Sequence, residues 1–140
     1  MTRSFSLAGL LRVRSIQERA AAQQLSRAVI EENQTRARER HLRAALAATD
    51  SEAVDVRSLA AMAAARVAGR SMLADLETLA QAQRQAVDDA QSAHSDARRE
   101  VRGLDRLAAA HASRMRADAL RAEQHELDEM ALRRGAEGSA

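Results

Sequence analysis

The sequence predicts an all-α protein, a long two-helix antiparallel coiled-coil hairpin with an overhanging C-terminal helix. Three observations predict this fold. The 140-residue chain has no proline, and Phe5 is its only aromatic residue. Its apolar fraction of 46% consists mainly of alanine, which buries too little area to build a globular core. Apolar residues also recur at alternating spacings of three and four residues along most of the chain, which is the pattern of coiled coils.

The candidate turn between the helices lies at about residues 49–55. Thr49 and Glu52 fit a capping box, and three nearby side chains are candidate N-caps for the second helix: Asp50, Ser51 and Asp55. Gly69 is a rival turn position because it would give arms of equal length. It lies, however, inside an uninterrupted helical pattern with no cap residue before it, so we place the turn at 49–55.

This turn defines a single coiled-coil hairpin over residues 1–140. We expect the first helix at about 5–48 and the second at about 56–134. Arg133 and Arg134 favour a helix C-terminus, and Gly135 is a suitable residue to end the helix. Residues 135–140 are therefore predicted to form a flexible tail.

Each predicted helix has a heptad seam, which is the row of residues expected to face the other helix. In the first helix the seam contains Leu7, Leu11, Ala21, Leu25, Ala28, Leu42 and Leu46, with polar steps at Arg14, Glu18, Glu32, Thr35 and Glu39. In the second it contains Leu59, Met62, Leu73, Leu76, Ala80, Val87, Ala90, Ala97, Val101, Leu104 and Ala108, with Arg66, Gly69, Gln83 and His94 as polar or small steps. Folding at the turn predicts that Leu46 meets Leu59 and that Leu25 meets Ala80.

The predicted second helix is too long for the first to cover. In this register the first helix ends opposite about residue 100, which leaves an overhang of about thirty residues, roughly 45 Å. After Ala108 the seam moves to Leu120, Gln124, Leu127 and Ala131. An unpaired apolar stripe indicates a binding surface for another protein or self-association. A parallel dimer of longer helices would use many of the same positions, so this alternative stays open.

The residue types give no indication of catalytic chemistry. There is no cysteine, and the four histidines form no pair with i, i+4 spacing and no cluster with carboxylates. A two-helix rod also offers no concave, water-excluding pocket. We therefore expect a non-enzymatic protein with no catalytic residues, no metal site and no cofactor.

Nucleic acid and membrane are weaker candidates for a partner. All 22 basic residues are arginine, but 20 acidic residues are interleaved with them, and the net charge is only +2. Such patterns are typical of solvated, salt-bridged helix faces. No apolar stretch approaches the ~20 residues of a membrane span. Residues 3–16 have the pattern of a surface-bound amphipathic helix or of a transit peptide, but we assign their leucines to helix pairing.

Both ends of the chain resemble the FliJ family, small coiled-coil proteins of the flagellar type III export apparatus. At the start, FSLAGLLRVRSIQERAAAQQLSRA places Phe5, Leu7, Leu10 and Leu11 ahead of Arg14 and Glu18, followed by an alanine-rich stretch. Near the end, EQHELDEMALRR has an apolar-Asp-Glu step followed by arginines. These two segments cover about a quarter of the chain, and the middle is similar in periodicity alone.

The resemblance implies a stalk similar to that of rotary ATPases, cytoplasmic and peripheral to the inner membrane at the flagellar base. The implied partners are the hexameric flagellar export ATPase, the cytoplasmic domain of the export gate and export chaperones, with no nucleic acid and no direct membrane insertion. The implied ATPase-binding residues are Leu7, Leu10, Leu11, Arg14, Glu18, Leu120, Leu127, Asp128, Glu129, Met130, Arg133 and Arg134. The implied gate-binding residues are Leu42, Leu46, Leu59 and Met62. The equivalent stalk of a virulence type III secretion system and a self-associating structural coiled coil are the alternatives.

Overall fold

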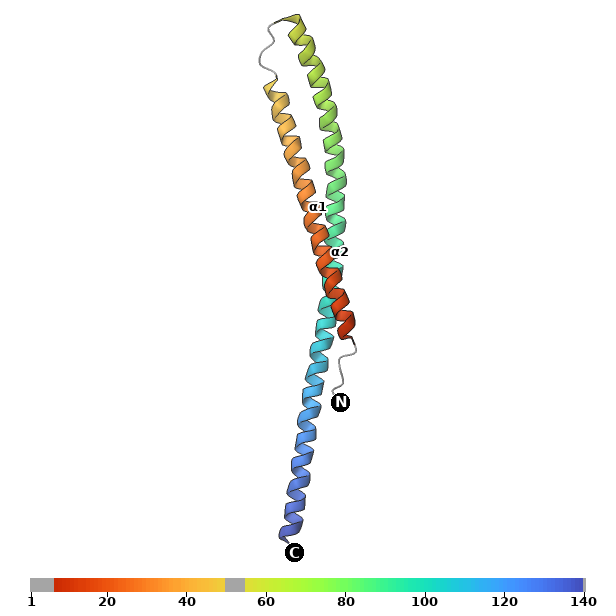
Figure 1. Ribbon diagram of the computed structural model, residues 1–140, viewed down its shortest axis with the longest axis vertical. Helices are drawn as coiled ribbons and strands as arrows, with labels where there is room; N and C mark the ends of the chain where they lie inside the picture. The colour runs from red at the N-terminus through yellow and green to blue at the C-terminus, as the bar shows by residue number, and fades with distance from the viewer. Residues whose placement is uncertain (1–6, 50–54, 140) are drawn as a thin grey trace. The chain divides into compact units, whose positions relative to one another are not determined.

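The computed structural model describes residues 7–49 and 55–139, and two long helices account for nearly all of them (Figure 1). Helix α1 spans Ala8–Ala48 and helix α2 spans Val56–Gly138. No strand occurs in these two ranges. The protein is therefore all-helical, as predicted. The predicted start at Phe5 and most of the predicted turn, residues 50–54, lie outside the described residues.

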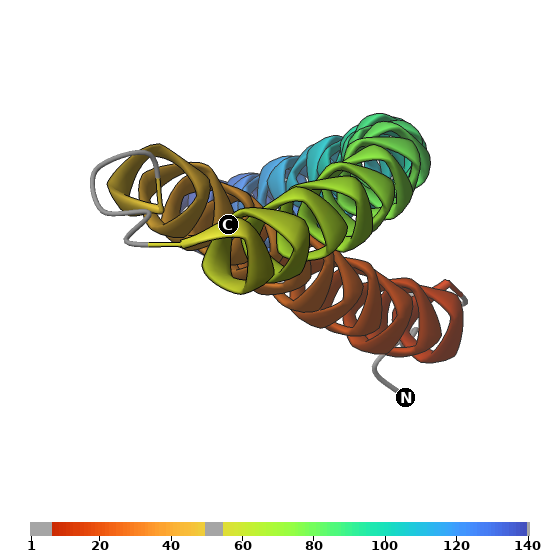
Figure 2. The ribbon, with the colours of Figure 1, turned by 90° about the horizontal axis from the view of Figure 1, so that it is seen from above.

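Contacts within the chain fall into two units, which are described separately. Unit 1 consists of residues 1–16 and 98–140, and unit 2 consists of residues 17–97. Each unit contains a segment of α1 and a segment of α2. Figure 2 shows the same two helices from a second direction, with α1 in red to yellow and α2 in yellow-green to blue.

Asp55 is the N-cap of α2, as the sequence predicts. Its Oδ1 accepts a 2.7 Å hydrogen bond from the backbone N–H of Ser58, one of the helix-terminal donors that have no partner within the helix. Hydrogen bonds from Ser58 also hold the pKa of Asp55 below its ordinary value.

Thr49 Oγ1 donates a 2.6 Å bond to the carbonyl of Ala45 at the end of α1, and Glu52, its predicted capping-box partner, lies outside the described residues.

Replacing Asp55 with alanine is expected to unwind the first turn of α2, whereas Asp55→Asn keeps an acceptor at the cap. A carboxylate whose pKa is lowered by folding stabilises the folded state at pH values above its pKa in the unfolded chain. This contribution is lost as the pH falls through its pKa in the folded chain. The first turn should therefore fray below about pH 4 in the unaltered chain, but not in Asp55→Asn. Backbone carbon chemical shifts of residues 56–59 measure both effects. Equal shifts in the alanine variant and the unaltered chain would contradict the assigned cap.

The other end of α2 differs from the prediction. The helix does not end at Arg134 but continues through Gly135 to Gly138, and the hydroxyl of Ser139 donates to the carbonyl of Gly135 at 2.7 Å. Glycine inside a helix costs about 1 kcal/mol relative to alanine, which weakens the helix without forbidding it. No described atom outside the helix backbone lies near the place where a Cβ of Gly135 would stand.

The predicted seams are confirmed by the pattern of burial. Along both helices, the half-buried and buried residues recur mainly at spacings of three and four, and most of them are predicted seam positions. The buried side chains are Thr35 at 2% exposure, Glu32 and Ala80 at 8%, and Val87 at 9%, and Gly69 is also buried. Leu59 is the exception, because it is 55% exposed and the neighbouring Ser58 is half-buried instead.

Several polar side chains of unit 2 interact across the two helices. His94 Nε2 lies 3.0 Å from Glu18 Oε1, and Arg43 Nη2 lies 3.1 Å from Glu77 Oε1. Glu32 binds Arg36 on its own helix and lies 3.8 Å from Arg84 Nε on α2. Each buried or half-buried carboxylate of this set therefore has a cationic or hydrogen-bonding neighbour, which offsets the cost of taking it out of water.

The predicted register in unit 2 is wrong. Leu46 does not meet Leu59 but lies against Gly69, ten residues further along α2. A Cβ on Gly69 would overlap the end of the Leu46 side chain and stand 3.2 Å from its Cγ, so a larger residue at position 69 would require Leu46 to shift. Ten residues are one heptad plus three, so the shift replaces one seam position with the other. The two seams therefore still face each other, which is why periodicity did not reveal the shift.

Candidate functional site

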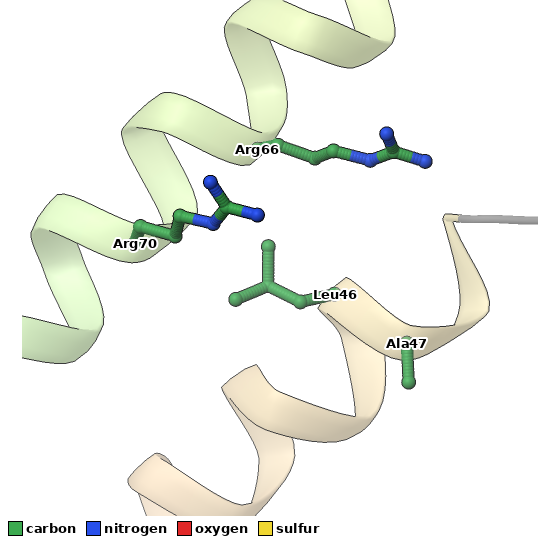
Figure 3. A pocket seen from close by; sticks show the side chains of 4 residues that line it. All are labelled: Leu46, Ala47, Arg66 and Arg70. Carbon is green, nitrogen blue, oxygen red and sulfur yellow. The ribbon is translucent and has the colours of Figure 1, made fainter.

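A shallow groove beside Leu46 includes one of the four residues predicted to bind the export gate, Leu46 itself. Leu46 points toward α2, and the side chains of Arg66 and Arg70 extend beside it, whereas Ala47 points away (Figure 3). Leu42 and Met62 are also half-buried, while Leu59 is exposed. Three of the four predicted gate residues thus take part in helix packing, and Leu59 alone presents an apolar side chain to solvent.

In unit 1, the first turns of α1 lie against α2. Arg14 Nη1 forms a 2.9 Å salt bridge with Glu100 Oε2, and both side chains are partly exposed. The pair borders a shallow groove whose other lining residues are Leu10, Gly103, Leu104 and Leu107. Leu7 and Leu11 are half-buried seam residues, whereas Leu10 is 41% exposed. Of the predicted ATPase-binding residues at this end, Leu10 is therefore the one with a large apolar surface open to solvent.

Glu18, another predicted ATPase-binding residue, belongs to unit 2, where it pairs with His94. The side chains of Arg14 and Glu18 thus both interact with residues of α2. The sequence signals this role because both residues interrupt the apolar seam, and a polar seam residue needs a polar neighbour opposite. Glu100 was not singled out from the sequence, although it lies next to the seam residue Val101.

The remaining predicted residues lie on the C-terminal segment, a name used here for residues 118–139 (blue in Figure 1). Every residue of this segment is exposed. Its large apolar side chains are open to solvent to a degree unusual for leucine and methionine: Leu120 is 66% exposed, Leu127 59%, Met130 52% and Leu132 74%. No described residue of unit 1 covers them.

The charged residues of the C-terminal segment interact only weakly with one another. Gln124 donates a 3.0 Å hydrogen bond to Asp128 Oδ1, and Arg133 Nη2 lies 3.9 Å from Glu129 Oε2. Both pairs have i, i+4 spacing, and Arg133 and Glu129 are mostly exposed. Exposed pairs of this kind contribute about 0.2–0.5 kcal/mol each. Their side chains can therefore exchange partners at little cost.

Within the described residues, the most prominent surface feature is the exposed apolar side chains of the C-terminal segment. No group of three or more metal-ligating side chains gathers in this part of the chain. Neither helix, as far as it is described, contains a stretch long and apolar enough to cross a bilayer. The grooves beside the helices are shallow and open. The fold and the exposed segment define a long helical protein of the interaction class.

The family of the chain follows from its sequence match. Residues 3–139, nearly the whole chain, match the family model described as "Flagellar FliJ protein", so the chain belongs to this family. It is thus a coiled-coil component related to flagellar protein export. No curated protein and no solved structure matches the chain significantly.

Proposed function

We propose that this protein is a non-enzymatic stalk that inserts into the hexameric flagellar export ATPase, promotes its assembly or activity and couples it to the export gate. The observation that carries the proposal is the exposed C-terminal segment with its uncovered apolar side chains. Family membership directs the choice of partner toward the flagellar export apparatus.

The stalk is proposed to be an antiparallel coiled-coil hairpin with an overhanging end. The contacts in each unit support this arrangement. In unit 2, Glu18 near the start of α1 pairs with His94, while Leu46 near its end contacts Gly69. In unit 1, Arg14 pairs with Glu100. Earlier residues of α1 thus meet later residues of α2, and the C-terminal segment extends past the last of these contacts.

Leu120, Leu127 and Met130 are proposed to supply most of the binding energy at the ATPase. Burying the exposed part of two leucines is expected to contribute about 2–4 kcal/mol. Asp128, Glu129, Arg133 and Arg134 surround them with charges that interact weakly inside the chain. Weak, exchangeable polar contacts suit a stalk that meets equivalent subunits in turn. Leu10 is the proposed contact from α1, and Arg14 and Glu18 act by holding the helices together.

The gate contact is proposed for the opposite end of the hairpin, where Leu59 is exposed and Leu42, Leu46 and Met62 are half-buried. Binding at both ends would let one chain connect the ring to the gate. A cytoplasmic position, peripheral to the inner membrane at the flagellar base, follows from these two partners, and export chaperones are further proposed partners. A stalk of a virulence type III secretion system would have the same design.

A pull-down tests the proposal. The intact chain and a version truncated after Met115 are each presented to the export ATPase of the same genome, and the ATPase rate is measured in parallel. The truncation removes the C-terminal segment and leaves the contacts of unit 2 in place. We expect the intact chain to bind and stimulate, and the truncated chain to do neither. Equal binding by both would place the contact elsewhere, and no binding by either would refute the stalk function.

A further inference from the structure

Four residues of the C-terminal segment form one continuous stripe along α2. Leu120, Gln124, Leu127 and Ala131 follow the alternating spacing of four and three residues, so they share one face of the helix. We call these residues the exposed stripe. Each is open to solvent, with Leu120 at 66% and Leu127 at 59% exposure. A seam with coiled-coil spacing needs a second helix with the same spacing to cover it.

We propose that a second copy of this chain covers the exposed stripe, with the two C-terminal segments running antiparallel. In the proposed register, Leu120 of one chain lies opposite Ala131 of the second copy, and Gln124 lies opposite Leu127. The two-fold symmetry of a homodimer repeats each contact. Every leucine of the stripe then faces alanine or the aliphatic part of glutamine, and no leucine of the stripe stays exposed.

The charges beside the stripe select this register. On one side, Arg121 faces Asp128 of the second copy. On the other side, Arg116 faces Glu137 of the second copy. Symmetry makes each pair occur twice, so all the charged contacts along the dimer join opposite signs. Surface pairs are individually weak, but residues beside a coiled-coil seam determine partner orientation and register.

The same charges oppose the other arrangements. In a parallel dimer in register, Arg116 of one chain would face Arg121 of the other, and Glu123 would face Asp128. Sliding the antiparallel pair by one heptad in one direction would place Arg121 opposite its own copy. Sliding it in the other direction would place Asp128 opposite its own copy. Each alternative therefore brings like charges together, which is destabilising.

The dimer is expected to be weak and reversible. The stripe has only two leucines per chain, and Gln124 stands at its centre, so the apolar area that is buried is small. In the chain alone, Arg121 Nη1 lies 3.3 Å from Asp118 Oδ1, and this exposed pair must rearrange. If the same stripe contacts the export ATPase, dimerisation covers the ATPase-binding surface until an ATPase ring competes for it. That consequence rests on the proposed function, whereas self-pairing does not.

Thiol crosslinking tests the orientation, because the described chain has no cysteine and the full sequence has none. Full-length Arg116→Cys and Glu137→Cys chains are treated with a short bis-maleimide, each alone and then mixed. The antiparallel register brings residue 116 of one chain to residue 137 of the other, but separates two copies of residue 116 by about 30 Å. We expect crosslinked dimers from the mixture only. Crosslinking of either variant alone would indicate a parallel dimer and overturn the proposal.

Sedimentation of the full chain over a range of concentrations tests the charge pairing. The unaltered chain should show a monomer–dimer equilibrium, and Arg121→Asp should weaken association about tenfold. The double variant Arg121→Asp/Asp128→Arg should restore it. Arg133→Asp and Glu129→Arg make the same charge changes on the outer face and should leave association unchanged. A chain that stays monomeric at every concentration, or an Arg121→Asp variant that associates more strongly, would refute the antiparallel pairing.

Discussion

Replacing Leu120 and Leu127 together with glutamate is expected to weaken binding to the export ATPase at least about thirtyfold. Both leucines are more than half exposed in the chain itself, so the fold does not depend on their burial. In the proposed complex they are buried, and the change removes apolar area and takes two carboxylates out of water. A binding titration with the purified ATPase measures the loss, and circular dichroism should show unchanged helicity.

Leu132→Glu is the matched control for this prediction. Leu132 is 74% exposed on the same segment, but it lies on a different face of α2 from Leu120 and Leu127. The control changes residue type and charge in the same way, and it should leave affinity within about threefold. If the double variant binds as tightly as the unaltered chain, the C-terminal stripe does not contact the ATPase. An equal loss with Leu132→Glu would indicate nonspecific charge repulsion.

Val87→Asp is expected to lower the stability of the chain, because it changes a buried residue of the seam between the helices. Val87 is 9% exposed within unit 2, and the substitution would place a carboxylate at this buried position and remove the apolar packing of the valine. We expect the free energy of unfolding to fall by at least about 2 kcal/mol, because a buried unpaired charge is costly and the packing of the valine is lost. Urea unfolding followed by circular dichroism at neutral pH measures the change.

The same substitution at Val67 provides the comparison. Val67 lies on the same helix and in the same unit, but it is 69% exposed, so Val67→Asp should alter stability by less than about 0.5 kcal/mol. Both variants carry the same charge change on the same helix. Equal effects at the two positions would mean that the seam through Val87 does not hold the helices together.

The sequence predicted the helices and their faces because helical periodicity is a local property. Residues such as Thr35, Ala80 and Val87 were placed in the seams by spacing alone, and the structure buries them. Asp55 was among the candidate caps for the same reason. Register could not be predicted in this way, since a slide of one heptad plus three residues still brings seam to seam. The contact between Leu46 and Gly69 shows the register, and Leu46 there occupies space that a side chain at position 69 would take.

The candidate site was predictable in part. Leu120, Leu127 and Met130 were predicted as uncovered apolar residues, and all three are exposed. Arg14 and Glu18 were assigned to the partner through family resemblance, yet each pairs with a residue of α2. Pairing across helices depends on register, so the neighbours Glu100 and His94 were not foreseen. Polar residues inside a seam are therefore better interpreted first as candidates for interhelical pairs.

The most direct test of the stalk hypothesis is native mass spectrometry of the intact chain mixed with the export ATPase under conditions that form the ring. A stalk inserted in the central pore predicts a complex with one chain per hexameric ring, because a single pore admits a single rod. The chain truncated after Met115 should give empty rings. A complex with one chain on every ATPase subunit, or rings that never carry the intact chain, would contradict the proposed stalk.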